Sequence, residues 1–167
     1  MPPVGSSDAR LLVLGSLPGE ASLRAQRYYA HPQNQFWRLL GGALGEDLAG
    51  LEYDERLARL AARDVALWDV VGQAFREGSL DGAIRGATPN QLREYAAGHP
   101  RLASIAFNGQ TAARLGRAAI GDLHRVRLVD LPSSSPAYTI PFAEKARRWA
   151  MLGALASGEE AATLGLL

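Results

Sequence analysis

The 167-residue chain has the length of a single domain, and a domain of this size can bury a core without disulfides or metal staples. Apolar residues make up 47% and charged residues 21%, which excludes a disordered or fibrous protein, and the absence of cysteine excludes disulfides, cysteine-ligated metal centres and thiol nucleophiles. The net charge is +1, but residues 101–150 carry a net +5, which is typical either of a surface that meets a polyanion or of solvated helix faces.

Four short apolar runs have the composition of buried strands: 10–15, 65–71, 102–107 and 125–131. Helical patterns lie between and after them at 35–44, 53–62, 90–97, 110–119 and 140–155. Buried strands that alternate with helices predict the α/β class. We expect a three-layer α/β/α domain with a central four-stranded, mainly parallel sheet, a core at about 10–155 and ends that lie outside it.

The last predicted helix has recognisable boundaries and a clear apolar stripe. Thr139 is a plausible N-cap, and Pro141 suits the first turn. The stripe to be buried comprises Phe142, Ala146, Trp149 and Ala150. The basic side chains of this helix, Lys145, Arg147 and Arg148, are expected to lie mainly away from the core.

In an open parallel sheet, ligands bind outside the carboxyl ends of the strands. The loops there are expected at 16–34, 72–88, 108–109 and 132–138. The first is long and rich in aromatic residues, so it is more typical of a functional loop than of a disordered one. It begins with GSLPG, which matches neither a dinucleotide motif, a P-loop nor a hydrolase nucleophile elbow.

The chain offers few other chemical motifs. No His pair has the spacing of a metal site, and no metal is expected. His31 is interpreted as a hydrogen bonder that fixes its loop, with a catalytic role as the alternative. The serines of LPSSSPAY suit phosphate oxygens, although a helix-entry turn would have a similar composition.

Four segments in order resemble the uracil-DNA glycosylase superfamily, and within it the branch of hypoxanthine-DNA (deoxyinosine) glycosylases. They are LLVLGSLPGEASLRAQRYYAHPQNQFWRLL, ALWDVVGQAFREGSLDGAIRGATPNQL, IAFNGQTAARL and LPSSSPAY, the last followed by a helix containing Trp149. The chain departs from the sister branches. It lacks the cysteines of the iron–sulfur type and the GQDPYH and HPSPLS motifs of the uracil-dedicated type, and it has Leu17 where the mismatch type has a catalytic Asn.

The resemblance implies a site for each step of base removal. Asn34 maps onto the catalytic Asn of the hypoxanthine branch and would accept a hydrogen bond from the attacking water. Tyr29 aligns with the stacking aromatic, with Tyr28 as the alternative. The implied base pocket comprises Gly15, Ser16, Leu17, Pro18, Gly19, Tyr29, His31, Asp69 and Asn108. The implied DNA-binding residues are Ser133, Ser134, Ser135, Pro136 and Tyr138.

For Asp69 and Asn108 the alternatives are a structural strand-end carboxylate and a left-handed turn. Tyr138 is either a DNA wedge or a hydrophobic anchor of the last helix.

The expected function is a monofunctional DNA glycosylase that removes hypoxanthine without a cofactor. A lyase step would need an amine, and Lys145, the only lysine, is expected to lie away from the strand-end loops. The alternatives are a uracil or mismatch-type glycosylase, a non-catalytic module that binds damaged DNA, and a small-molecule hydrolase using Ser134 and His31. DNA is the expected partner of a monomer. Without a signal peptide or a long apolar run, a cytoplasmic location away from membranes is expected.

Overall fold

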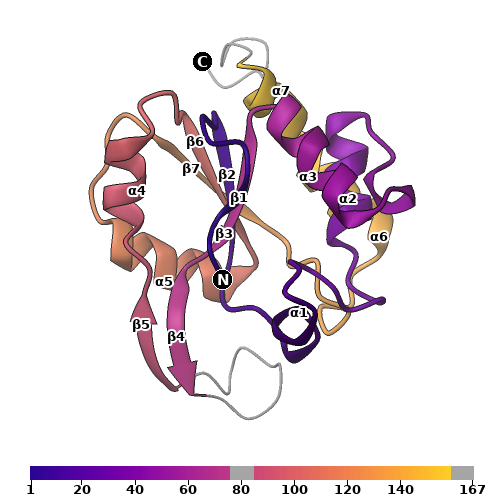
Figure 1. Cartoon of the computed structure of the whole chain (residues 1–167), viewed down its shortest axis with the longest axis horizontal. Coiled ribbons are helices and arrows are strands. Elements are labelled where there is room, and N and C mark those ends of the chain that lie inside the picture. The colour runs from indigo at the N-terminus through magenta and orange to yellow at the C-terminus, as the bar shows by residue number, and fades with distance from the viewer. Residues whose placement is uncertain (76–84, 159–167) are drawn as a thin grey trace.

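The computed structural model describes residues 1–75 and 85–158 (Figure 1). Within these residues, the central sheet has five strands in the order β1-β3-β2-β6-β7. The strands are β1 Val4–Gly5, β2 Leu11–Gly15, β3 Val65–Asp69, β6 Ser104–Asn108 and β7 Arg127–Leu131. The four predicted strands pair in parallel, and β1 joins β3 in antiparallel orientation. The mainly parallel sheet is therefore confirmed, whereas the expected number of four strands was too low.

Helices cover both faces of the sheet (Figure 1). Leu11 and Val13 of β2 pack into one hydrophobic cluster, and Leu12 and Leu14 pack into another on the opposite face. This alternation follows from the two-residue period of a strand. One face carries α2 Phe36–Leu44, α3 Tyr53–Ala62, α6 Phe142–Trp149 and α7 Leu152–Ser157, and the other carries α4 Leu92–Gly98 and α5 Gln110–Ile120. The expected three layers are confirmed.

Two strand-end loops contain more regular structure than expected. The 16–34 loop contains the short helix α1 Glu20–Ala25. In place of the expected 72–88 loop, β4 Val71–Phe75 and β5 Arg85–Pro89 form an antiparallel pair, and residues 76–84 lie outside the described part of the chain. The predicted strand 65–71 divides into β3 and β4 at Val70. A one-residue break of this kind leaves an apolar run intact, so hydrophobic patterning does not reveal it.

The last predicted helix is interrupted and starts later than expected. Pro141, and not Thr139, occupies the N-cap of α6, and a break after Trp149 separates α6 from α7. Ala150, which was expected to be buried, is exposed at this break. Without a Cβ, Gly153 of α7 can approach α2 closely, since a methyl group there would lie 2.3 Å from the Ala43 carbonyl oxygen.

Lys145 lies on the buried face of α6, contrary to the sequence prediction. Its side chain follows Phe142 by three positions and precedes Trp149 by four, so all three lie on one face of the helix. Only 1% of Lys145 is exposed to solvent. Arg147 and Arg148 are exposed, as expected.

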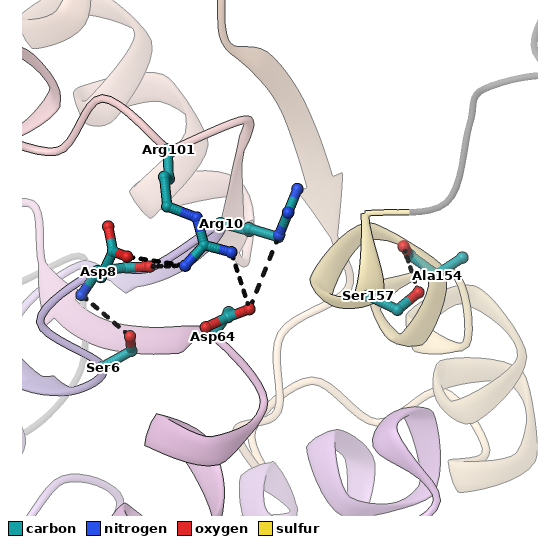
Figure 2. A network of polar contacts seen from close by, with 7 residues as sticks. All are labelled: Ser6, Asp8, Arg10, Asp64, Arg101, Ala154 and Ser157. Atoms are coloured by element: carbon teal, nitrogen blue, oxygen red, sulfur yellow. Dashed lines mark hydrogen bonds and ion pairs between the residues drawn. The ribbon is translucent and has the colours of Figure 1, made fainter.

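An ion-pair network joins the starts of the strands, at the edge opposite their carboxyl ends (Figure 2). Arg101 contacts Asp8 at 2.8 Å and Asp64 at 3.3 Å, and Arg10 contacts Asp64 at 3.7 Å. These side chains are substantially exposed, so each pair contributes little stability. The network therefore lies at the amino-terminal ends of the strands, away from the carboxyl ends where ligands of an open parallel sheet bind.

The N-terminal residues are part of the packed structure, although the core was expected to begin near residue 10. The Tyr28 hydroxyl donates to the carbonyl oxygens of Met1 and Pro2, at 3.2 and 2.6 Å. The Trp68 indole also donates to the Met1 carbonyl oxygen, at 3.1 Å. No helix within residues 1–75 and 85–158 has the length and apolar character needed to cross a bilayer.

Candidate active site

A cavity of about 380 Å³ lies at the carboxyl ends of the parallel strands. It is lined by the segments that follow β2, β3, β6 and β7, which bring together residues from four distant parts of the sequence. All nine residues of the expected base pocket line it, as do Asn34, Ser133, Ser134, Ser135 and Tyr138. Pro136 does not line the cavity. The sequence analysis did not assign Ala21 and Ser22 to the site, although both lie in the expected 16–34 loop.

Gly15, the last residue of β2, allows two side-chain oxygens to converge at the cavity. A methyl group on Gly15 would lie 2.8 Å from the Tyr29 hydroxyl and 2.9 Å from a carboxyl oxygen of Asp69. Both distances are too short for a real Cβ, so an alanine here would displace one of the two groups. Asp69 itself is 4% exposed, and its carbonyl oxygen accepts a hydrogen bond from the Asn90 amide at 2.8 Å.

The aromatic ring of Tyr29 lines the cavity and is supported by a second ring. The Tyr29 ring stacks on that of Phe36, with centroids 3.7 Å apart and planes 9° from parallel. Phe36 is fully buried and covers one face of Tyr29, and the Tyr29 ring lines the cavity as an aromatic wall. The backbone of Tyr29 has a φ of +55°, a left-handed conformation that is uncommon for a bulky residue and is often found at functional sites.

Tyr28 also contacts the cavity, but it belongs to the core. It is 2% exposed, and its hydroxyl is engaged by the N-terminal carbonyl groups. Burial, together with the charge of nearby Asp69, raises the pKa of its phenol well above the usual range. The alternative assignment of Tyr28 as the stacking aromatic is therefore disfavoured.

A chain of hydrogen bonds connects Tyr29 to Asn34 through the end of the sheet. The Asn108 amide donates to the Tyr29 hydroxyl at 3.3 Å and to Ser134 Oγ at 2.9 Å, while Asn108 Oδ1 accepts from the Ser134 backbone at 2.9 Å. Ser134 Oγ then donates to Asn34 Oδ1 at 2.8 Å. Asn108 has a negative φ, which excludes the left-handed turn considered for it, and both hydrogens of its amide are donated to protein groups.

The orientation of the Asn34 amide is fixed by two donors. Asn34 Oδ1 accepts from the Phe36 backbone at 3.0 Å as well as from Ser134 Oγ. A backbone N–H cannot accept, so the reversed amide would lose this bond. With both acceptor positions of Oδ1 occupied, Nδ2 is the group that can contact a ligand or a water. The expectation that Asn34 accepts a hydrogen bond from water is therefore corrected, because the amide is set to donate.

The serines after β7 differ in their exposure. Ser134 is fully buried, so its hydroxyl cannot contact a phosphate, contrary to the sequence prediction. Ser133 and Ser135 are half-buried, and each hydroxyl accepts a hydrogen bond from a backbone N–H two residues on. Tyr138 is 41% exposed, which excludes a role as a buried anchor for the last helix.

His31 fixes its own loop, as expected. Its Nδ1 accepts a hydrogen bond from the Gln33 backbone at 3.1 Å, and the Ser134 hydroxyl is bonded to the two asparagines and not to His31. The structure thus lacks the Ser134–His31 pair that a small-molecule hydrolase would require.

Lys145 lies directly behind the cavity, although it was expected to lie away from it. Its ammonium donates to Gln35 Oε1 at 2.9 Å and to the Ser135 carbonyl oxygen at 3.1 Å. Desolvation lowers the pKa of this ammonium from its ordinary value. Within the described ranges, no three His, Asp or Glu side chains gather as a metal-ligand set.

The fold and the cavity define a class of protein: a three-layer α/β domain whose mainly parallel sheet ends at a cavity with an aromatic wall. A sequence model of the Uracil DNA glycosylase superfamily matches residues 2–157, and the chain belongs to this superfamily.

Relatives support this assignment. A hypoxanthine DNA glycosylase of Methanosarcina barkeri is 43% identical over 109 residues, which cover 65% of this chain and 69% of the relative. One from Methanosarcina acetivorans is 38% identical over 136 residues, 81% of this chain and 85% of the relative. A solution NMR structure from Methanosarcina acetivorans, described as a candidate uracil DNA glycosylase, has a TM-score of 0.81 at 35% identity and covers 93% of this chain and 96% of its own.

Proposed function

We propose that this chain is a monofunctional DNA glycosylase that hydrolyses the N-glycosidic bond of deoxyinosine and releases hypoxanthine. The observation that carries the proposal is the Asn34 amide, which is fixed by Ser134 and Phe36 in a cavity walled by Tyr29. The relatives named hypoxanthine DNA glycosylase support the choice of base.

Cleavage develops positive charge on the deoxyribose and negative charge on the departing base. Sugar glycosidases handle these charges with two carboxyl groups. Among the described residues that line this cavity, Asp69 is the only one with a carboxyl group. Catalysis would therefore depend on positioning and hydrogen bonding, with Asn34 Nδ2 donating to a water that has a lone pair facing C1′. The bond from this water oxygen to C1′ forms as the bond from C1′ to hypoxanthine breaks, and the proton that the water loses ends on the departing base.

The target base would leave the helix and enter the cavity. Unstacking costs a few kcal/mol, which contacts in the pocket must offset. The Tyr29 ring, which lines the cavity, would stack on the base, and such stacking is worth about 1–3 kcal/mol per base. A carboxyl oxygen of Asp69 can accept the N1–H of hypoxanthine, whereas adenine has a lone pair at N1 and would be disfavoured there.

The 132–138 loop would contact the flanking DNA. Ser133 and Ser135 present hydroxyls that can still donate to phosphate oxygens, and Pro136 and Tyr138 are exposed beside the cavity mouth. The basic segment 101–150 would provide sequence-independent attraction. A monomer acting in the cytoplasm is the simplest form of this proposal.

The lyase reaction is disfavoured because the single lysine is inaccessible. Lys145 is 1% exposed, and its ammonium is held by Gln35 and Ser135, so it cannot attack C1′. We therefore propose hydrolysis by water because Lys145 is buried, and not because Lys145 lies far from the strand-end loops, as the sequence analysis assumed.

The test uses labelled duplexes that carry one deoxyinosine, uracil or xanthine, followed by alkali to cut abasic sites. Strand cleavage of the deoxyinosine duplex only after alkali supports a monofunctional hypoxanthine glycosylase. Release from uracil alone would support the mismatch-type alternative. Tight binding to an abasic duplex without release of any base would support a damage-binding module.

A further inference from the structure

Helix α6 holds the 132–138 loop at two points. Trp149 donates through its indole nitrogen to the Pro132 carbonyl oxygen at 2.9 Å. One turn earlier, the Lys145 ammonium donates to the Ser135 carbonyl oxygen at 3.1 Å. Residues four apart share a helix face, so both donors project from one face of α6 toward the loop.

The Lys145 ammonium also reaches the segment that carries Asn34. It donates to Gln35 Oε1 at 2.9 Å, and Gln35 is the next residue after Asn34. The backbone of Gln35 in turn donates to the Ser134 carbonyl oxygen at 3.0 Å. One buried ammonium therefore joins the 132–138 loop to the start of α2, at a point adjacent to the fixed Asn34 amide.

The positively charged ammonium of a lysine is costly to bury. Lys145 is 1% exposed, and among the described residues no carboxylate lies within 4 Å of its ammonium. The desolvation of an ion costs several kcal/mol, and an apolar side chain of similar length would fill the same space without this cost. A requirement for both hydrogen bonds explains why a lysine stands here.

The Lys145 ammonium also lies beneath the exposed aromatic ring of Tyr138 in this loop. Its nitrogen is 5.5 Å from the centroid of the Tyr138 ring, within the range of a cation–π contact. The backbone at Pro132 and Ser135 and the ring of Tyr138 are thus all held by α6.

We propose that Lys145 is a positioning residue, which holds the DNA-contacting 132–138 loop and the Asn34 segment in one fixed relationship. The consequence is that the loop contacts the DNA at the same nucleotide on which the Asn34 amide acts. This inference rests on the proposed function, because it assigns the two segments to one reaction. A small misplacement of a positioned group can cost about 100-fold in rate.

Two variants remove the hydrogen bond between Lys145 and Gln35, each by changing one of the two residues. Lys145→Met keeps the length of the side chain and removes the ammonium, while Gln35→Leu keeps Lys145 and removes its acceptor beside Asn34. Arg59→Gln is the matched control, since it removes a positive charge from an exposed position of α3, outside the basic segment 101–150. Amide hydrogen exchange reports on residues 34–38 and 132–138, and single-turnover base release is measured with the enzyme saturating.

The expected result is faster exchange in both segments and a fall of about 10- to 100-fold in the saturated rate for both variants. Arg59→Gln should match wild type in both measurements. A lysine with only a structural role would lower the melting temperature and leave the saturated rate of the folded protein unchanged.

Faster exchange in the 132–138 segment alone, or a saturated rate within twofold of wild type, would overturn the proposal. If Lys145→Met does not fold, Gln35→Leu decides the same question. If the wild-type protein releases no base, the proposed function fails, and the exchange data alone decide whether Lys145 couples the two segments.

Discussion

Ser134 Oγ donates a 2.8 Å hydrogen bond to Asn34 Oδ1 across 100 residues of sequence. The two residues lie on different strand-end segments, and the bond is partly buried, since Ser134 is fully inaccessible to solvent and Asn34 is half-buried. A buried hydroxyl bonded to an amide is stabilising and directional. The geometry of the candidate site therefore depends on a residue that does not reach the cavity mouth.

Ser134→Ala should slow base release by about 10- to 100-fold at saturating enzyme, because Asn34 Oδ1 loses one of its two donors and the amide can rotate. The loss of the buried bond should also lower the free energy of unfolding by about 1–2 kcal/mol. Single-turnover kinetics and urea unfolding measure the two effects. Ser104→Ala is the control, since Ser104 is equally buried at the opposite end of the sheet. Equal rates for the two variants would count against this role for Ser134.

Tyr29→Ala should weaken binding to deoxyinosine duplexes by the value of one stacked base, about 1–3 kcal/mol. Tyr29→Phe keeps the ring on Phe36 and loses the hydroxyl that accepts from Asn108, so it should bind nearly as well as wild type. Both variants retain a Cβ at a φ of +55°, so they share the backbone strain. Fluorescence anisotropy with labelled duplexes separates the two cases, and similar affinities for both variants would show that the ring does not stack on the base.

Asp69→Asn should reduce the discrimination between hypoxanthine and adenine. A carboxyl oxygen accepts from N1–H of hypoxanthine, whereas an asparagine can instead donate to the N1 of adenine. Release from deoxyinosine should fall by about 10- to 100-fold, the value of a hydrogen bond to a charged group. Asp130→Asn, at an exposed position of β7, is the control. Unchanged release by Asp69→Asn would assign this carboxyl group to a structural role at the end of β3.

Tyr95→Phe should stabilise the protein, and more so at alkaline pH. Tyr95 is 8% exposed, and within the described residues its hydroxyl has no hydrogen-bond partner, so its removal should raise the free energy of unfolding by about 1 kcal/mol at pH 7. Burial raises the pKa of this phenol from 10 to about 12. The unfolded state then loses its proton at lower pH than the folded state, so Tyr95 makes the wild type less stable between pH 10 and 12.

Urea unfolding of both proteins from pH 8 to 12 measures this difference. The stability gap between Tyr95→Phe and wild type should widen above pH 10. A constant gap would contradict the raised pKa.

The strands and the loops at their carboxyl ends were accessible from sequence because they depend on local patterns, whereas the residues of the base pocket were implied by the family resemblance. Buried strands such as β2 are continuous apolar runs, and parallel strands bring the loops after them to one edge of the sheet. The position of Asn34 in the site came from resemblance, since nothing in the local pattern distinguishes it from Gln33 or Gln35.

The errors arose where tertiary contacts override average behaviour. Lys145 was expected outside because lysine is rarely buried, but Gln35 and the Ser135 carbonyl group compensate its ammonium only in the folded chain. Ser134 was grouped with its neighbours as a phosphate ligand, because sequence does not indicate which of three consecutive serines points inward. The two-residue strand β1 is too short to leave a pattern.

The central claim is that the fixed Asn34 amide directs release of hypoxanthine by water. Its most direct test is to measure free hypoxanthine by mass spectrometry after incubation of a deoxyinosine duplex with wild type and with Asn34→Ala, both shown by circular dichroism to be folded.

The account predicts release by the wild type that is at least 100-fold slower in Asn34→Ala, with binding to an abasic duplex retained. Equal release by the two proteins, or no release by the wild type, would contradict it.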